Sequence, residues 1–502
     1  MTALDRTCPV AVVGTGTMGQ GIAQVALIAG HPVRLYDALP GRAEQAASAI
    51  AGRLDRLVEK GRLSAEAREA AHARLTPAAS LADLAGCGLV VEAVLERLDV
   101  KQGLFRELED IVGEDCLLAT NTSSLSVTAI AGGLKRPGRF VGLHFFNPAP
   151  LLPLVEVVSG FATDEAAATR AYETAGAWGK RPVRCADTPG FIVNRVARPF
   201  YAEALRIHEE RAADPATIDA VLRACGGFKM GPFELTDLIG QDVNEAVTRS
   251  VWESFFQDAK FTPSLAQRRL VESGRLGRKS GQGWFDYAEG AQQHGPRLEE
   301  PAAAPAEVGM HGDFGPAEML EGLFKAAGIT VRRGTSERPF LSLPEGGVLV
   351  PAGGTMAGGH GDAVQFDLAL DYEAATLIAL APSRTAAPAT LRAATGLFQA
   401  AGKQVTVIGD IPGMIVARTV AMLFDFALDA LDKGVASAQD IDTAMRLGVN
   451  YPLGPLEWGE RIGLERVHDL LSLMHETQPT GRYAPSVGLR RRVQAQEETV
   501  TP

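Results

Sequence analysis

The sequence predicts an α/β domain followed by a helical domain, a reduced α/β segment and a second copy of the helical domain. Three observations lead to this division. Short apolar runs alternate with helical patterns up to about residue 186, which is typical of a parallel sheet wrapped by helices. From Asp187 onward the pattern is helical, and the second half of the chain repeats its spacing at an offset of 223 residues.

The first element is the apolar run 10–13, which leads into Gly14-Thr15-Gly16-Thr17-Met18-Gly19 and then into a helical pattern. A strand, a glycine turn and a helix N-terminus form a Rossmann nucleotide site, because the free backbone N–H groups suit a pyrophosphate. The next strand ends at Asp37, whose carboxylate can bind the ribose hydroxyls and repel a 2′-phosphate, so NAD is favoured over NADP. The alternative for the glycines alone is an ordinary tight turn. The expected NAD-binding residues are Gly14, Gly16, Thr17, Met18, Gly19 and Asp37.

Two stretches of unusual composition help to divide the chain. Residues 42–74 are charged and alanine-rich, and they look like a pair of helices around Gly61. Residues 288–308 are rich in Ala, Pro, Gln and Glu, which is typical of a linker. The predicted parts are a nucleotide-binding domain at 1–186, a helical domain at 187–287, the linker at 288–308, a reduced α/β domain at 309–405, a second helical domain at 406–490 and a polar tail at 491–502.

The repeat keeps some residues that shape the chain but loses a residue of the candidate active site. Asp187 falls on Asp410, but Asn194 falls on Ala417, so the copy is not expected to be a second active site. The segment 309–405 also lacks a glycine motif that directly follows a strand, and its glycines are better explained by a loop.

Composition excludes several classes of protein. The net charge of −11 argues against general affinity for nucleic acid or anionic membranes. The five cysteines have no metal-site or paired spacing, so neither zinc, nor another bound metal, nor a disulfide framework is expected. The first strand begins by about residue 9, and no apolar run approaches the ~18 residues of a membrane span, so neither an export signal nor an anchor is predicted. We expect a cytoplasmic protein.

An acid–base pair is predicted near the middle of the first domain. Glu156 lies inside the apolar run 154–158, where a carboxylate is costly to bury unless a partner holds its charge. His144, twelve residues earlier, is the candidate partner, and a neutral imidazole is well suited to accept a proton near neutral pH. The alternative for His144 alone is a buried structural histidine.

Two neutral donors accompany this pair. Ser123 lies in Asn121-Thr122-Ser123-Ser124, and Asn194 follows the turn at Pro189-Gly190. Hydroxyl and amide donors suit an oxygen whose charge develops only during a reaction. The segment around Ser123 could equally cap a helix, and both roles are compatible.

With these motifs, the chain resembles the L-3-hydroxyacyl-CoA dehydrogenase family over residues 9 to about 287, and the repeated helical domain extends the match to about 490. The duplication resembles the bacterial subgroup that acts on 3-hydroxyadipyl-CoA in phenylacetate degradation, and related enzymes for 3-hydroxybutyryl-CoA. The resemblance implies reversible, NAD-dependent oxidation of an L-3-hydroxyacyl-CoA to the 3-ketoacyl-CoA. Two alternatives stay open, a dehydrogenase of free 3-hydroxy acids and a non-enzymatic NAD-binding protein.

The resemblance also assigns roles to individual residues. It implies that His144 accepts the proton of the 3-hydroxyl, that Glu156 orients His144, and that Ser123 and Asn194 bind the substrate. An exposed charge pair is the alternative for two of the residues that it assigns to the cofactor, Glu96 and Lys101. The residues assigned to the nicotinamide half are Glu96, Lys101, Ser123 and Asn147, with Lys279 contributed by the helical domain.

The substrate's ends and the quaternary state are less defined. The cations of 42–74 could meet the 3′-phosphate of an acyl-CoA, or they could form a solvated face. Arg198 and Lys229 could recognise a terminal carboxylate, or they could lie on the surface. The cations of 42–74 are Arg53, Arg56, Lys60 and Arg62.

Because single-copy members of the family dimerise through the helical domain, we expect a homodimer, or a monomer in which residues 406–490 imitate the partner.

Overall fold

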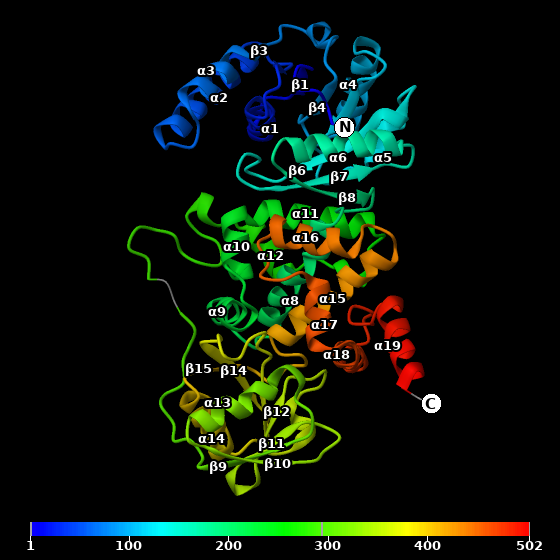
Figure 1. Ribbon diagram of the computed structural model, residues 1–502. Helices are drawn as coiled ribbons and strands as arrows, with labels where there is room; N and C mark the ends of the chain where they lie inside the picture. Colours follow the sequence, from blue (N-terminus) through cyan, green and yellow to red (C-terminus); the bar gives the residue numbers. More distant parts are fainter. Residues whose placement is uncertain (1–2, 293–294, 501–502) are drawn as a thin grey trace. The chain divides into compact units, whose positions relative to one another are not determined.

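The computed structural model describes residues 3–292 and 295–500 (Figure 1). The chain forms two compact units, one of Met1–Arg195 with Lys433–Val449 and the other of Val196–Asp432 with Asn450–Pro502. Residues 293–294 of the predicted linker and 501–502 of the predicted tail lie outside the described residues. The finer division into six parts stays a prediction.

An eight-stranded sheet organises the first unit, with the order β3-β2-β1-β4-β5-β6-β7-β8. Only β6 and β7 pair in the antiparallel sense. The central strands are buried along their whole length, as expected for apolar runs covered by helices on both faces. The strands are β1 (Val10–Val13), β2 (Val33–Tyr36), β3 (Leu75–Pro77), β4 (Leu89–Glu92), β5 (Leu117–Thr120), β6 (Phe140–Phe145), β7 (Leu154–Ser159) and β8 (Arg181–Ala186).

Helices connect these strands. The pair predicted around Gly61 forms as two helices that lie side by side, and the first buries only a narrow stripe of Ala43, Ala46, Ile50 and Leu54. Ser64 caps the second, because its hydroxyl accepts from the N–H of Ala67. The helices are α1 (Thr17–Ile28), α2 (Arg42–Glu59), α3 (Ala65–Ala73), η1 (Leu81–Leu84), α4 (Leu98–Ile111), α5 (Val127–Ala131), η2 (Pro137–Arg139), α6 (Glu165–Ala177) and α7 (Val193–Val196).

One segment from the far end of the chain belongs to this first unit. Helix α16 (Ala438–Gly448) packs against β7 and β8, and the N–H of Ala186 donates to the carbonyl of Val435. The sequence pattern places these residues in the second helical domain, so part of that domain completes the sheet edge of the first unit.

The second unit contains a seven-stranded mixed sheet with the order β10-β9-β11-β12-β13-β14-β15. Strands β14 and β15 flank α14, just as β7 and β8 flank α6, at the repeat's offset. The elements are β9 (Glu307–His311), η5 (Gly315–Met319), α13 (Leu320–Ala326), β10 (Thr330–Gly334), β11 (Phe340–Ser342), η6 (Pro344–Gly346), β12 (Val348–Pro351), η7 (Ala357–His360), β13 (Ala363–Phe366), β14 (Leu377–Pro382), α14 (Pro388–Ala400) and β15 (Gln404–Val407).

Two sets of helices accompany this sheet. Pro232 and Pro455, which the repeat aligns, each begin a helix directly after a glycine. The predicted tail is helical through residue 500 and packs against α15 and α18. The helices are α8 (Arg198–Glu209), α9 (Pro215–Gly226), α10 (Pro232–Ile239), α11 (Gln241–Ser254), η3 (Ala259–Phe261), α12 (Leu265–Glu272), η4 (Arg278–Ser280), α15 (Val416–Asp432), α17 (Pro455–Ile462), α18 (Leu464–Thr477) and α19 (Val487–Val500).

A buried ion network joins the two helical copies inside the second unit. Glu203 of α8 accepts from Nε of Arg418 at 2.7 Å and from Nε of Arg482 at 2.9 Å. The Tyr483 hydroxyl donates to the same carboxylate, and Arg418 also donates to Glu210 at 2.8 Å. Burial acts to raise the pKa of Glu203, but Arg482 and Arg418 outweigh it and lower that pKa to about 2. The copies are therefore held by fully paired charges.

Candidate active site

The side chains of His144 and Glu156 form a buried pair. Strands β6 and β7 place the two residues directly opposite each other, so both side chains lie on one face of the sheet. Nδ1 of His144 lies 2.7 Å from Oε2 of Glu156, and the two side chains are 7% and 0% exposed. The predicted partners are thus in hydrogen-bond contact, and the buried carboxylate has the partner that it needs.

Glu156 also holds the start of α7. Its Oε1 accepts from the backbone N–H of Ile192 at 3.1 Å and of Val193 at 2.9 Å. Phe191, just before them, has a φ of 50°, which turns the chain so that both N–H groups point at the carboxylate. One side chain therefore orients the imidazole and fixes the turn that carries Asn194.

The other ring nitrogen of His144 is available for chemistry. The ring lies between Phe146 and Phe191, whose ring centroids are 4.5 and 5.7 Å from that of His144. Because a carboxylate can only accept, a neutral imidazole at this position would donate from Nδ1 to Glu156 and keep its lone pair on Nε2. Nε2 can thus accept a proton from an alcohol.

Ser123 and Asn194 lie beside each other. Nδ2 of Asn194 donates to the carbonyl oxygen of Ser123 at 3.5 Å. Asn121, two residues earlier, accepts from the N–H of Phe145 at 2.8 Å, which ties this loop to the residue that follows His144. The structure therefore brings the loop of Ser123, the end of β6 and the start of α7 together in the first unit.

The predicted cofactor residues Glu96 and Lys101 form a second ionic cluster. Oε1 of Glu96 accepts from the N–H groups of Ser123 and Ser124 at 3.0 and 3.1 Å, and from the hydroxyls of Thr122 and Ser124. Nζ of Lys101 lies 3.2 Å from Oε2 of Glu96. Burial acts to raise the pKa of Glu96, but Lys101 and these hydrogen bonds outweigh it, so the pKa is lowered.

Sequence reasoning missed Glu92, the buried member of this cluster. Its Oε1 lies 2.6 Å from Nζ of Lys101, with the two side chains 0% and 1% exposed, and its Oε2 accepts from the Thr120 hydroxyl. The exposed surface pair considered for Lys101 is therefore wrong, because the ammonium is buried. Glu92 ends an apolar strand, so the rule that singled out Glu156 could also have found it.

The glycine turn leaves space where a pyrophosphate would lie. A Cβ on Gly14, whose φ is +93°, would lie 2.5 Å from the carbonyl oxygen of Ala93, and one on Gly19 would lie 1.8 Å from that of Gly14. Gly16 differs, because a Cβ there would have no atom within 4 Å. The first and third glycines are thus required by packing, and the second faces open space at the start of α1.

Asp37 lies at the carboxyl end of β2 beside this turn. Its Oδ2 accepts from the N–H and hydroxyl of Thr15 at 2.9 and 2.7 Å. Burial acts to raise its pKa, but the hydrogen bonds from Leu39 and Thr15 outweigh it and lower the pKa. A carboxylate beside a helix N-terminus and an open glycine cradle fits the ribose and pyrophosphate of NAD.

The remaining predicted residues are divided between the two units. Thr17 and Asn147 line one cavity of about 450 Å³ in the first unit, and Met18 lies in the first turn of α1. Lys279 belongs to the second unit, where its ammonium pairs with Asp242. The cavity also receives the cations predicted to meet an acyl-CoA, namely Arg53, Arg56, Lys60 and Arg62.

The second copy retains the local packing without the acid–base pair. At the offset of 223, His144 is replaced by Asp367, Glu156 by Ala379 and Asn194 by Ala417. The Asp367 carboxylate accepts from the backbone N–H groups of residues 415–417 at 2.8 to 3.2 Å. The turn that Glu156 holds in the first copy is therefore held here by a carboxylate in the position of the histidine.

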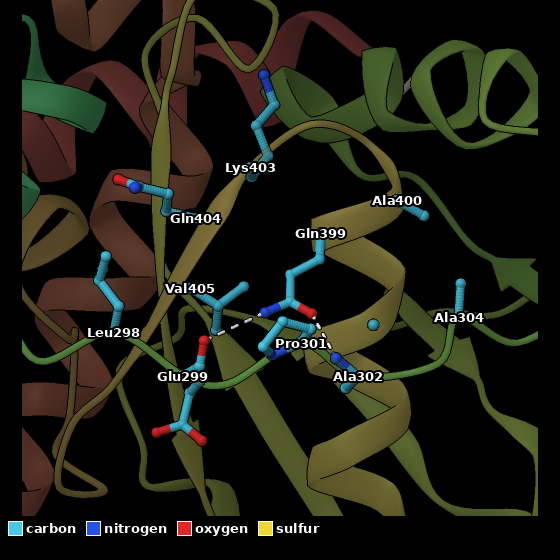
Figure 2. A pocket seen from close by; sticks show the side chains of 11 residues that line it. Leu298, Glu299, Pro301, Ala302, Ala304, Gln399, Ala400, Lys403, Gln404 and Val405 are labelled. Carbon is cyan, nitrogen blue, oxygen red and sulfur yellow. Dashed lines mark hydrogen bonds between the residues drawn. The ribbon is translucent and has the colours of Figure 1, made fainter.

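Another cavity, of about 600 Å³, lies between residues 298–304 and α14 (Figure 2). Figure 2 shows Gln399 reaching from α14 to this segment, where it accepts from the N–H of Ala302 at 2.8 Å and donates to the carbonyl of Glu299. Lys403 donates to the carbonyl of Glu373. These polar groups bind the chain itself, and the lining contains no histidine or cysteine, so we place no chemistry there.

Other kinds of site are not found in the described part of the chain. No group of three or more His, Cys, Asp or Glu residues among residues 3–292 and 295–500 could hold a metal ion. Within those same ranges, no helix is long and apolar enough to cross a bilayer. The five cysteines are all unpaired.

The Rossmann sheet, the open glycine cradle and the His–Glu pair together define a dehydrogenase that uses a nicotinamide dinucleotide. Comparison with known proteins narrows this class. The NAD-binding domain of 3-hydroxyacyl-CoA dehydrogenase matches residues 9–188, and its C-terminal domain matches residues 190–287 and 413–500. The reduced Rossmann-fold domain of 3-hydroxybutyryl-CoA dehydrogenase matches residues 350–412. The chain belongs to the 3-hydroxyacyl-CoA dehydrogenase family, which confirms the predicted family, fold class and cofactor.

Relatives of two sizes are similar to this chain. The 3-hydroxyadipyl-CoA dehydrogenase of Escherichia coli K12 is 46% identical and covers 96% of this chain and 97% of its own. A probable 3-hydroxybutyryl-CoA dehydrogenase of Deinococcus radiodurans is 40% identical over 55% of this chain and 99% of its own. A solved 3-hydroxybutyryl-CoA dehydrogenase from E. coli K12 has a TM-score of 0.90 and 43% identity, and covers 99% of this chain and all of its own.

Proposed function

We propose that this enzyme oxidises an L-3-hydroxyacyl-CoA to the 3-ketoacyl-CoA with His144 as the general base. The observation that carries the proposal is the buried 2.7 Å contact between Nδ1 of His144 and Glu156, which leaves Nε2 as the proton acceptor. Proton transfer by a positioned imidazole is worth about 10² to 10⁴ in rate.

Several residues of the chain take part in this proton transfer or support it. When bound, NAD⁺ supplies the acceptor for the hydride that leaves C3. Nε2 of His144 accepts the proton of the 3-hydroxyl, and the Glu156 carboxylate stabilises the imidazolium that forms. Ser123 and Asn194, which contact each other, would supply neutral donors to the oxygen and the thioester region as the carbonyl develops.

The first unit also supports binding of the dinucleotide. Gly14, Gly16 and Gly19 open the N-terminus of α1 to a pyrophosphate, and Asp37 would accept from the adenosine ribose. Glu96 and Lys101, beside Ser123, would bind the nicotinamide half. Together these residues would hold the cofactor along one edge of the sheet.

The cavity beside α2 favours a CoA thioester over a free 3-hydroxy acid. The Arg53 guanidinium donates to the amide oxygens of Gln20 and Gln24 at 3.0 and 3.1 Å, which are neutral acceptors. Burial and the neighbouring Arg56 lower the pKa of Arg53, as expected for a guanidinium close to another cation. A small acid would not need this cationic cavity, whereas the phosphates of coenzyme A would bind there.

The acyl group is proposed to be six carbons long with a terminal carboxylate. The E. coli relative that covers nearly the whole chain is named for 3-hydroxyadipyl-CoA, whereas shorter relatives are named for 3-hydroxybutyryl-CoA. The four-carbon thioester is the second candidate, because the solved E. coli structure bears that name.

The second helical copy is proposed to replace a dimer partner. The ion network on Glu203 joins α8 to α15 within the second unit, as a partner subunit would do in a dimer of single-copy chains. Sedimentation of the full chain is expected to show a monomer, and a stable dimer would contradict this.

The five unpaired cysteines support a reducing compartment such as the cytoplasm.

Formation of NADH from a panel of L-3-hydroxyacyl-CoAs tests the function. The panel holds the four-carbon, six-carbon and adipyl thioesters, with free 3-hydroxybutyrate as the control. Turnover of thioesters that is lost in His144→Gln, with NAD binding unchanged, is expected. Turnover of the free acid alone would refute the CoA assignment, and tight NAD binding without any turnover would favour a non-enzymatic protein.

A further inference from the structure

A cavity of the second unit lies where the repeat places the counterpart of the candidate active site. It has a volume of about 540 Å³ and is lined by the loop after β12 and by helices α15 and α18. At the offset of 223, two of its lining residues, Leu368 and Ala417, correspond to Phe145 and Asn194. Phe145 directly follows His144, so the cavity takes the position of the base and its neighbours.

The sheet register adds the counterpart of Ser123. Strand β12 pairs in parallel with β13 as β5 pairs with β6, and the offset aligns β13 with β6. In this register Val350 takes the place of Thr120, and three residues further along, Gly353 takes the place of Ser123. Gly353 lines the cavity, and its carbonyl accepts from the N–H of Gly413 at 2.8 Å. The loop therefore lies beside the turn before α15, as the Ser123 loop lies beside α7.

The side chains at these positions cannot repeat the oxidation. Glycine and alanine replace Ser123 and Asn194, so the hydroxyl and amide donors are lost. Asp367 stands in the position of His144, and its carboxylate is held by the backbone N–H groups of residues 415–417. A ligand of this cavity would therefore be bound and not converted.

A dinucleotide does not fit this copy. Strands β9 and β10 pair in parallel on either side of α13, like β1 and β2 around α1, so the turn after β9 corresponds to the glycine turn. A Cβ on Gly315 in this turn would lie 2.7 Å from the guanidinium carbon of Arg466, whereas Gly16 faces open space. Because Arg466 also pairs with Asp313 at 2.6 Å, its side chain fills the place of a pyrophosphate.

Coenzyme A is disfavoured as well. In the first unit, the cations proposed to meet its phosphates belong to α2 and the segment before α3. In the described part of the second unit, β10 is followed by β11 without a helix between them, so this helical pair has no counterpart. The phosphates of an acyl-CoA would therefore lack the cations that they require.

The lining favours an apolar chain. Most of the lining residues are apolar, among them Leu470 and Leu473 of α18 and Ala421 of α15. Ala421 corresponds to Arg198, which is itself buried and not on the surface, so a cation is absent from this position of the copy. The volume lies within the range of about 300 to 1,000 Å³ that is common for small-molecule sites.

The charged lining residues indicate where an anionic end would bind. Arg338 is exposed, and among the described residues no carboxylate forms an ion pair with it. Its carbonyl carbon would lie 3.3 Å from a Cβ on Gly312, so Arg338 lies beside the turn after β9. His360 is another exposed cation of the lining, whereas Asp469 and Glu476 are exposed anions of α18. A carboxylate would therefore avoid α18 and bind at Arg338.

We propose that this cavity binds a free carboxylic acid with an apolar chain of medium length. The carboxylate pairs with Arg338, and the chain lies against the leucines and alanines of α18 and α15. The second copy is then a binding site that has lost the chemistry of the first.

Equilibrium dialysis of the full chain with octanoate tests the proposal. Saturating NADH and hexanoyl-CoA are included to fill the candidate active site. One octanoate should bind per chain, about tenfold more tightly than hexanoate, because each added methylene contributes about three- to fourfold in affinity. Absence of saturable octanoate binding would overturn the proposal.

Arg338→Gln tests the position of the carboxylate. It should weaken octanoate binding by about three- to fivefold, as expected for a solvent-exposed ion pair, and leave the binding of neutral octan-1-ol unchanged. Arg392→Gln is the matched control, since Arg392 is an exposed arginine of the same unit outside the lining, and it should change neither. Equal effects of Arg338→Gln on the acid and the alcohol would refute the pairing.

Ala417→Leu tests the location of the chain. Its larger side chain should fill part of the cavity and weaken octanoate binding at least about tenfold, while NADH formation is unchanged. Unaltered octanoate binding would overturn the proposal. If the variant does not fold, hydrogen exchange of the unaltered chain decides the matter. Octanoate should slow exchange in residues 352–354 and 466–473, and unchanged exchange in both segments would overturn the proposal.

Discussion

The ammonium of Lys101 lies 2.6 Å from the carboxylate of Glu92, and both side chains are almost completely excluded from solvent. Glu92→Gln would leave that ammonium with the partly exposed Glu96 as its remaining anion. We expect a loss of about 3 to 5 kcal/mol in the free energy of unfolding, as for a broken buried pair, and weaker NAD binding. Denaturant unfolding and calorimetric titration with NAD measure the two effects.

The control for Glu92 is an exposed pair. Lys135 and Asp110 lie 2.6 Å apart with side chains 73% and 64% exposed, so Asp110→Asn should cost less than about 1 kcal/mol. Equal losses in the two variants would show that burial of Glu92 is not what makes its pair important.

Glu156→Gln should separate chemistry from cofactor binding. Glutamine keeps an oxygen for the N–H groups of Ile192 and Val193, but it cannot hold Nδ1 of His144 through a carboxylate. We expect kcat to fall by about 10² to 10⁴ while the Kd for NAD stays within about threefold. Steady-state kinetics and NAD titration provide the comparison, and an unchanged kcat would exclude the orienting role.

Two glycine substitutions should have opposite consequences. Gly19→Ala places a Cβ 1.8 Å from the carbonyl oxygen of Gly14, so it should lower the Tm of the protein without cofactor. Gly16→Ala has open space around it, so its Tm should be unchanged, while the Kd for NAD rises at least about tenfold because the methyl group occupies the pyrophosphate's place. Thermal unfolding and NAD titration of both variants test this, and normal NAD affinity in Gly16→Ala would contradict it.

Because Glu203 is paired with arginines, the free energy of unfolding should depend on pH in the acid range. Its pKa is lowered from 4.5 to about 2, so its contribution is complete above pH 4.5 and is lost as the pH falls toward 2. Full loss corresponds to about 3 kcal/mol. Unfolding followed between pH 6 and pH 2 should show a smaller acid-dependent loss in Glu203→Gln than in the unaltered protein. Parallel curves would mean that Glu203 does not titrate in this range.

Local patterns were enough to predict the nucleotide turn and the pairing of His144 with Glu156. Both depend on residues that one or two neighbouring strands bring together. A carboxylate in an apolar run also indicates a buried charge that needs a partner. The same offset that aligned Asn194 with Ala417 also aligns His144 with Asp367, so the lost base of the second copy was within reach of the sequence.

Long-range packing was not predictable in this way. Arg198 is buried and donates to the hydroxyl of Thr248, which no local periodicity connects to it. The place of α16 beside β8 likewise joins segments about 250 residues apart, and the helical pattern of α16 is that of any surface helix. Such contacts form between segments that come together only when the whole chain folds.

The contact of Glu203 with Arg418 joins two helices that belong to one polypeptide. In a dimer, the corresponding association would weaken on dilution, because its free energy depends on the concentration of subunits. Here a covalent tether supplies each helical copy with its neighbour at a fixed effective concentration. The helices of the second unit should therefore stay associated in a very dilute solution.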